Sequence, residues 1–126
     1  IMTTQDQIKN AIKWIDGLKN TKLPQGKFSL GNKEDGFCCL GYACEILSVP
    51  YNSFDTYSKE LPDYVGLKNS TGSFQKLIIG DAYSLTNLND IENYSFRRIS
   101  TILKKHPHEI FVADVAKGIE NHYKNK

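Results

Sequence analysis

The sequence contains no apolar run approaching the roughly 20 residues that span a bilayer, and no charged and apolar succession typical of a secretory signal. Methionine and tryptophan occur once each and proline four times, and no segment is repetitive or of low complexity. Seven tyrosines and six phenylalanines supply apolar bulk, which argues against disorder. We therefore expect one folded domain over residues 1–126, without membrane contact.

An excess of charge of one sign is also missing. Sixteen basic and 14 acidic residues leave a net charge of +2, which does not make nucleic acid the default partner. The local basic excess lies in Arg97, Arg98, Lys104 and Lys105. On one helix these side chains spread over more than one face, which favours a solvated surface. Contact with RNA or DNA through them is kept as an alternative.

Cysteine is scarce and clustered, because Cys38, Cys39 and Cys44 lie within seven residues. An odd number of cysteines argues against a disulfide framework and for a reducing compartment, so we expect a cytoplasmic protein. Adjacent cysteines do not readily form a relaxed disulfide. The spaced ligand pairs of a zinc site are missing too, so we expect neither a metal nor a cofactor.

Apolar periodicity and capping signals predict about five helices, the first opened by a Thr4–Gln7 capping box. The expected helical segments are 4–18, 38–47, a short turn at 61–67, one or two turns at 83–89, 95–105, and a last helix that begins at Pro107. Ser95 caps the fifth of these segments and Pro107 ends it, while Pro50 ends the second.

Two segments are expected to form β-structure. Residues 28–30 read as a short strand followed by a turn at 31–32, and residues 66–80 read as a hairpin. The predicted fold is a single compact α+β domain, predominantly helical, with one or two small β-hairpins. Ile1 is interpreted as a cloning remnant before Met2, and residues 124–126 as a frayed tail.

The cysteine cluster allows two interpretations. A cysteine in the first turn of a helix has its thiolate stabilised by unpaired backbone N–H groups, which would make Cys38 or Cys39 a nucleophile. The interpretation that we favour is that these cysteines are small apolar residues filling a tight helix contact beside Gly41.

A thiol enzyme would also need a base and an orienting group. His106 and His108 are the candidate bases, with Asn89 or Asp90 as the orienting group. These histidines flank Pro107, so a helix junction is the simpler explanation for them.

A second constellation joins residues 85–90 to residues 95–99. Asn89, Asp90 and Arg97 are candidate ligand-binding residues there. The favoured alternative for Asn89 and Asp90 is helix capping, because short polar side chains satisfy orphan backbone groups at helix ends. No calcium-loop pattern is present, which supports the expectation of no metal.

Together these constellations resemble a group of small, uncharacterised proteins from bacteriophages and bacterial genomes. The shared pattern is Phe-Cys-Cys-Leu-Gly-x-x-Cys, a Leu-Pro turn, Leu-x-x-Leu-Asn-Asp and Ser-Phe-x-x-Ile, matched here at 37–44, 61–62, 85–90 and 95–99. The resemblance covers roughly residues 8 to 105. It implies a phage-associated or mobile-element accessory protein in the host cytoplasm, and it brings no activity with it.

The sequence therefore favours a non-enzymatic binding module that engages a host protein or sequesters a small ligand such as a nucleotide. The first alternative is a cysteine-nucleophile hydrolase or transferase, and the second is a weak nucleic-acid binder. Oligomeric state is not encoded in any pattern that we recognise.

Overall fold

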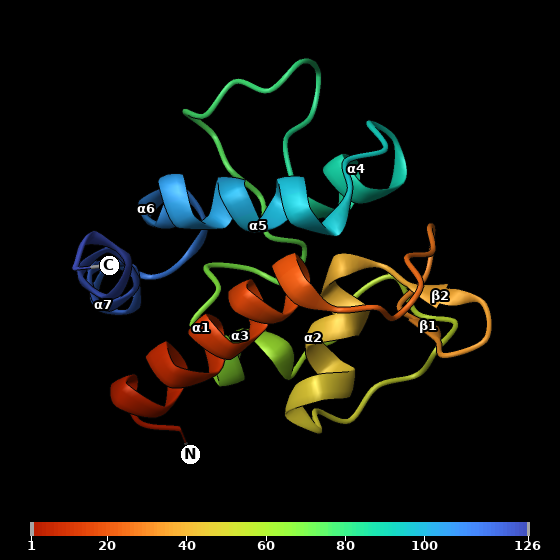
Figure 1. The fold of residues 1–126 in the computed structure, drawn as a ribbon, viewed down its shortest axis with the longest axis horizontal. Helices are drawn as coiled ribbons and strands as arrows, with labels where there is room; N and C mark the ends of the chain where they lie inside the picture. Colours follow the sequence, from red (N-terminus) through yellow and green to blue (C-terminus); the bar gives the residue numbers. More distant parts are fainter. Residues whose placement is uncertain (1, 126) are drawn as a thin grey trace.

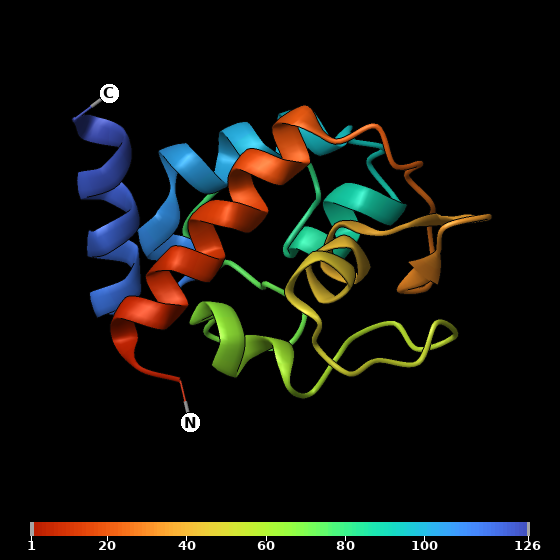
Figure 2. The same cartoon turned by 60° about the horizontal axis from the view of Figure 1, so that its bottom comes forward.

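The computed structural model describes residues 2–125, and helix α1 (Thr4–Asn20) lies across the middle of the molecule (Figures 1 and 2). Thr3 caps this helix and forms a capping box with Asp6, one residue before the predicted pair. Four α1 side chains are fully buried: Ala11, Trp14, Ile15 and Leu18. Four other helices of the described chain pack against α1, so α1 is the centre of the core.

The remaining elements follow in chain order. They are β1 (Gly31–Asn32), β2 (Gly36–Phe37), α2 (Cys39–Leu47), α3 (Leu61–Val65), α4 (Leu85–Asp90), α5 (Phe96–Lys105), α6 (Pro107–Ile110) and α7 (Ala113–Lys124). Within residues 2–125 the fold is therefore mostly helical α+β, with one two-stranded antiparallel sheet, which confirms the predicted class. The β1–β2 hairpin and α7 lie at opposite ends of the long axis in both ribbon views. None of the described helices is both long and apolar enough to cross a membrane.

Helices α2 and α5 begin where the sequence predicts, near Cys38 and after the cap Ser95. The Cys38 sulfur accepts the backbone N–H of Gly41, and the Ser95 hydroxyl accepts that of Arg98. These contacts satisfy donors that have no partner inside the helix.

The first hairpin is displaced from its predicted position. Residues 28–30 are not a strand, and 31–32 form β1 instead of the turn. Gly31 and Gly36 have φ angles of 89° and 95°, a region that favours glycine. A Cβ at Gly31 would also overlap the carbonyl of Gly36. Glycine at both strand starts therefore sets the register.

Residues 66–84, here called the long loop, do not form the second predicted hairpin. Only isolated bridges occur in this segment, joining Leu67 to Phe111, Ser73 to Ser84 and Ile79 to Ala82. In Figure 1 the long loop arches beyond α5, with α1 on the other side of that helix. Two of these bridges lie within the loop, which folds back on itself between Ser73 and Ser84, outside the predicted hairpin turn. Only Leu67 pairs with a distant segment.

The single helix predicted from Pro107 is split into α6 and α7. Phe111 bridges to Leu67, and the N–H of Val112 donates to the carbonyl of Gly66 at 2.8 Å. These contacts hold the chain extended between the two helices. Lys124 is the last residue of α7, and Ile1 and Lys126 lie outside the described residues.

Candidate functional site

The two sequence constellations meet in space. The side-chain oxygen of Asn89, at the end of α4, accepts the backbone N–H of Cys39 at 3.2 Å, although 50 residues separate them. Asp90 follows and accepts a hydrogen bond from Asn89 at 2.7 Å. The start of α2 and the end of α4 therefore form one buried polar junction.

The Asn89 amide is fully used inside this junction. Its oxygen also accepts from the Gln25 amide at 2.8 Å, and its nitrogen donates to the Gly26 carbonyl at 2.9 Å as well as to Asp90. An amide offers two donors and two acceptor positions. Because partners within residues 2–125 fill all four, the structure gives no support to Asn89 as a ligand-binding group.

Gln25 is the residue of this junction that the sequence did not indicate. Its amide nitrogen also donates to the Tyr94 carbonyl at 2.8 Å, and its oxygen accepts the N–H of Phe96 at 3.1 Å. We call Gln25 and Asn89 the amide clamp, because together they join the segment after α1 to α2, α4 and α5. No local pattern predicts such a contact across 64 residues.

The cysteine thiols are buried and protonated at neutral pH. Burial raises the pKa of Cys38 from 9.0 to about 11, although the N–H of Gly41 acts in the opposite direction. Burial also raises the pKa of Cys39 well above 9.0, and that of Cys44 to about 12. The expected stabilisation of a thiolate at the start of α2 is therefore outweighed by desolvation.

The two candidate bases lie away from these thiols. His106 and His108 flank the α5–α6 junction, which both ribbon views place apart from α2. Among the described residues no hydrogen bond joins a histidine to a cysteine sulfur, and His108 instead contacts Glu120 at 3.5 Å. The structure does not bring Cys38 or Cys39 together with a histidine.

The other two candidate ligand-binding residues, Asp90 and Arg97, lie in different surroundings. Asp90 is 8% exposed beside Asn89, whereas Arg97 is exposed on α5 and makes none of the clamp's hydrogen bonds. Across residues 2–125, no group of three or more His, Cys, Asp or Glu side chains is placed to hold a metal ion.

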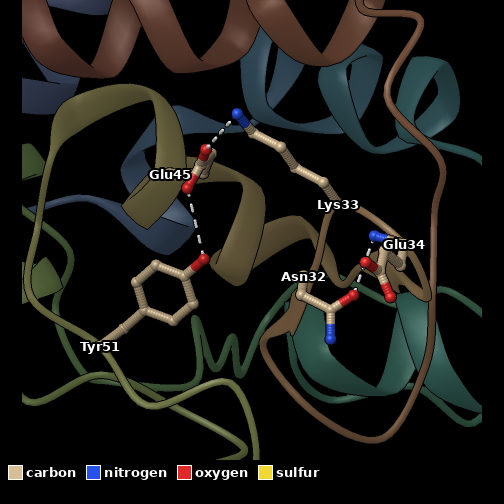
Figure 3. Close-up of polar contacts among 5 residues, drawn as sticks. All are labelled: Asn32, Lys33, Glu34, Glu45 and Tyr51. Carbon is tan, nitrogen blue, oxygen red and sulfur yellow. Dashed lines mark hydrogen bonds and ion pairs between the residues drawn. The ribbon is translucent and has the colours of Figure 1, made fainter.

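A second polar cluster lies between the β1–β2 hairpin and α2, and Figure 3 shows it. The Glu45 carboxylate accepts the Tyr51 hydroxyl at 3.3 Å and contacts the Lys33 ammonium at 3.5 Å. Burial raises the pKa of Tyr51, and the neighbouring Glu45 adds to the effect. In the hairpin turn, Asn32 accepts the N–H of Glu34 at 2.9 Å. These contacts bind the hairpin, α2 and the following segment to one another.

A cavity of about 570 Å³ lies in the irregular segment after α2. Tyr51 and Tyr57 contribute to its lining, together with the carboxylates of Asp55 and Glu60 and the ammonium of Lys59. Two negative groups against one positive group disfavour a phosphate-bearing ligand. The cavity therefore does not support nucleotide binding.

A groove of about 360 Å³ lies between the long loop and α5. Its lining residues are Leu77, Ile78, Ile79, Tyr94, Arg98, Thr101, Ile102, Lys105 and His106. Ile78 is 86% exposed, although it is a large aliphatic residue. An exposed apolar lining rimmed by polar groups is typical of an interaction site.

The rim of this groove is basic. Arg98, Lys105 and His106 contribute to the lining and no carboxylate does. The guanidinium carbon of Arg98 lies 3.7 Å from the centre of the Tyr94 ring, a cation–π contact that holds the side chain in place. These basic residues stand out in the sequence, whereas residues 77–79 do not, because a short apolar run has the same pattern whether it is buried or exposed.

We compared the chain with protein families, curated proteins and solved structures, and none of them matches it. Of the sites described, the amide clamp is internally satisfied, the thiols are buried, and the groove between the long loop and α5 is open and has unpaired charge at its rim.

Proposed function

We propose that this chain is a non-enzymatic binding module, of the phage or mobile-element accessory type that its resemblance implies, and that it engages a host protein. The contact surface is the groove between the long loop and α5. The observation that carries the proposal is Ile78, which is 86% exposed in a groove with further apolar lining residues. Covering one such side chain contributes about 1.5–3 kcal/mol to association.

The anchoring of the long loop supports this proposal. The half-buried Glu109, on α6, accepts the backbone N–H groups of Lys76 and Leu77 at 3.0 and 3.2 Å through its carboxylate. These two hydrogen bonds hold the chain immediately before Ile78 in one position. A preorganised segment loses less conformational entropy on binding than a free one.

The alternatives have weaker support. A thiol hydrolase needs an accessible thiolate and a base, whereas Cys38 and Cys39 are buried, have raised pKa values and have no histidine partner in the described part of the chain. Small-ligand sequestration would use the cavity lined by Asp55 and Glu60, whose charge disfavours nucleotides.

The test compares proteins captured from cross-linked host cells by three tagged forms of the chain: wild type, Ile78→Asp and Phe54→Asp. Phe54 is 88% exposed but does not line the groove, so it controls for the loss of any exposed apolar side chain. We expect a set of proteins, quantified by mass spectrometry, that is lost with Ile78→Asp and retained with Phe54→Asp. Equal recovery by both variants, or no specific recovery by wild type, would contradict the proposal.

A further inference from the structure

We infer that the groove binds an acidic amphipathic segment of a partner protein, with apolar side chains against Ile78 and Ile102 and carboxylates against Arg98 and Lys105. This inference rests on the proposed function and names the chemistry of the partner. It starts from the size of the groove, because about 360 Å³ admits a few side chains of one segment and not a folded domain.

The apolar part of the surface comes from two walls. Leu77, Ile78 and Ile79 line it from the long loop, and Ile102 lines it from α5. An apolar stripe on the partner segment can contact both walls at once. Such helix-in-groove recognition is a recurring use of amphipathic segments.

The charged part of the surface is unpaired. The described residues contain two ion pairs, Lys33–Glu45 and His108–Glu120, so Arg98 and Lys105 form none. Within residues 2–125 no hydrogen bond occupies the guanidinium of Arg98, and its stacking on Tyr94 leaves the N–H fork available. A carboxylate is the group that this fork binds in bidentate geometry.

A nucleic-acid partner fits this surface less well. Single-stranded bases stack on open aromatic faces, and here the face of Tyr94 carries the Arg98 guanidinium. Much of the lining is aliphatic and offers no hydrogen bonds to phosphate. A bilayer is also disfavoured, because a concave groove receives a segment, whereas a membrane presents a flat surface.

The experiment is a selection from a random-peptide display library against the folded wild-type chain, repeated with two charge variants. Arg98→Glu/Lys105→Glu reverses the charge of the groove rim. Lys13→Glu/Lys117→Glu makes the same change in net charge at exposed residues of α1 and α7, away from the groove. Ile78→Asp tests the apolar wall. Far-UV circular dichroism verifies that each variant is folded.

We expect wild type to enrich peptides that combine aliphatic residues with Asp and Glu. Their affinity should fall at least about tenfold with Arg98→Glu/Lys105→Glu and with Ile78→Asp, and change little with Lys13→Glu/Lys117→Glu. A selection against Arg98→Glu/Lys105→Glu should instead enrich peptides that contain Lys and Arg.

Three results would overturn the inference. Peptides without acidic enrichment that still depend on Ile78 would refute the acidic partner and leave the binding module standing. Peptides whose affinity is unchanged by both groove variants, or no enrichment of any peptide, would refute the groove as a peptide-binding site. Tighter, Ile78-dependent binding of oligouridylate RNA or phosphatidylserine vesicles would reassign the surface to nucleic acid or membrane.

Discussion

A few polar side chains satisfy backbone groups deep in the interior. The Trp14 indole donates to the Cys39 carbonyl at 3.0 Å, and the Ser100 hydroxyl donates to the Ile15 carbonyl at 2.8 Å. Asn89 completes this set by accepting from the Cys39 backbone N–H. Each of these bonds joins two elements that are distant in sequence. Their loss leaves a buried donor or acceptor unpaired, which costs more than an exposed hydrogen bond.

Asn89→Ala should therefore be strongly destabilising. The change leaves the N–H of Cys39 and the carbonyl of Gly26 without their partners, and we expect a loss of about 2–4 kcal/mol in the free energy of unfolding. Urea denaturation measures it. The control is Asn121→Ala on the exposed side of α7, which should stay within about 0.5 kcal/mol. An unchanged urea midpoint for Asn89→Ala would show that the clamp is dispensable.

The thiols should be unreactive in the folded protein. Cys38, Cys39 and Cys44 are buried and their pKa values are raised, so little thiolate is exposed at neutral pH. Mass-resolved alkylation with iodoacetamide should label all three only in concentrated urea. One cysteine that labels quickly in the native protein would instead point to an activated nucleophile.

Cys38 should also make stability depend on alkaline pH. The unfolded thiol ionises near 9.0 and the folded one near 11, so between these values the unfolded state binds fewer protons and is favoured as pH rises. Stability contributed by this group is intact below pH 9.0 and falls by up to about 1.4 kcal/mol per pH unit above it.

The matched variant is Cys38→Ser, because a serine hydroxyl can accept the N–H of Gly41 in place of the sulfur. Urea unfolding at neutral pH and near pH 10 should show a wild-type loss that exceeds the variant's by about 1.4 kcal/mol. Equal losses would mean that Cys38 ionises alike in both states.

At the scale of elements, one glycine lets α2 approach its neighbour. A Cβ on Gly41 would overlap the backbone carbonyl of Leu30. Hydrogen bonds fix the backbone of Leu30 on both sides, because its carbonyl oxygen accepts the N–H of Cys38 and its N–H donates to the carbonyl of Asp55. Gly118 on α7 offers a comparison, because a Cβ there would meet the side-chain end of Ile8. Side-chain ends move more easily than backbone held by hydrogen bonds.

Gly41→Ala should cost about 3 kcal/mol by overpacking, while Gly118→Ala should stay within about 1 kcal/mol because improved helix propensity offsets the shift of Ile8. Thermal unfolding of both variants measures the difference. A Gly41→Ala protein as stable as wild type would mean that the contact between α2 and the Leu30 segment is loose.

The elements that could be predicted from sequence are those with local signals. Helix α5 follows from its cap Ser95 and from Pro107, and α2 follows from its apolar positions and from Pro50. The hairpin register, the irregular long loop and the break between α6 and α7 depend on contacts between distant segments, such as Leu67 with Phe111. Periodicity carries no information about such pairs.

The same limit applies to the site. Cys38–Cys39 and Asn89–Asp90 stand out in the sequence as separate motifs, but their junction and the participation of Gln25 need the folded chain. Arg98 and Lys105 are recognisable as basic residues, whereas their position beside Ile78 is not.

The whole molecule is organised around α1, which packs against α2, α3, α5 and α7. The only tryptophan, Trp14, is fully buried on this helix and packs edge-to-face on Phe111, with ring centres 6.2 Å apart. Its surroundings thus include residues from both halves of the chain. Its fluorescence therefore depends on the packing of α1 against segments that are distant in sequence.

Trp14 fluorescence and far-UV circular dichroism should report one coincident urea transition, because α1 cannot lose its neighbours without exposing the indole. Tryptophan emission should shift to longer wavelength as the chain unfolds. Refolding by dilution verifies that the urea transition is reversible. Two separated midpoints would show that part of the helical structure unfolds independently of α1.

The packing of α1 against late elements has a consequence for folding during synthesis. α1 leaves the ribosome before its partners α5 and α7, and α5 begins only at Phe96. At 5–20 residues per second, the 76 residues from Asn20 to Phe96 need roughly 4–15 s. During this interval the apolar face of α1 that contains Trp14 lacks its partners α5 and α7, so the nascent chain exposes an aggregation-prone surface before the fold can close.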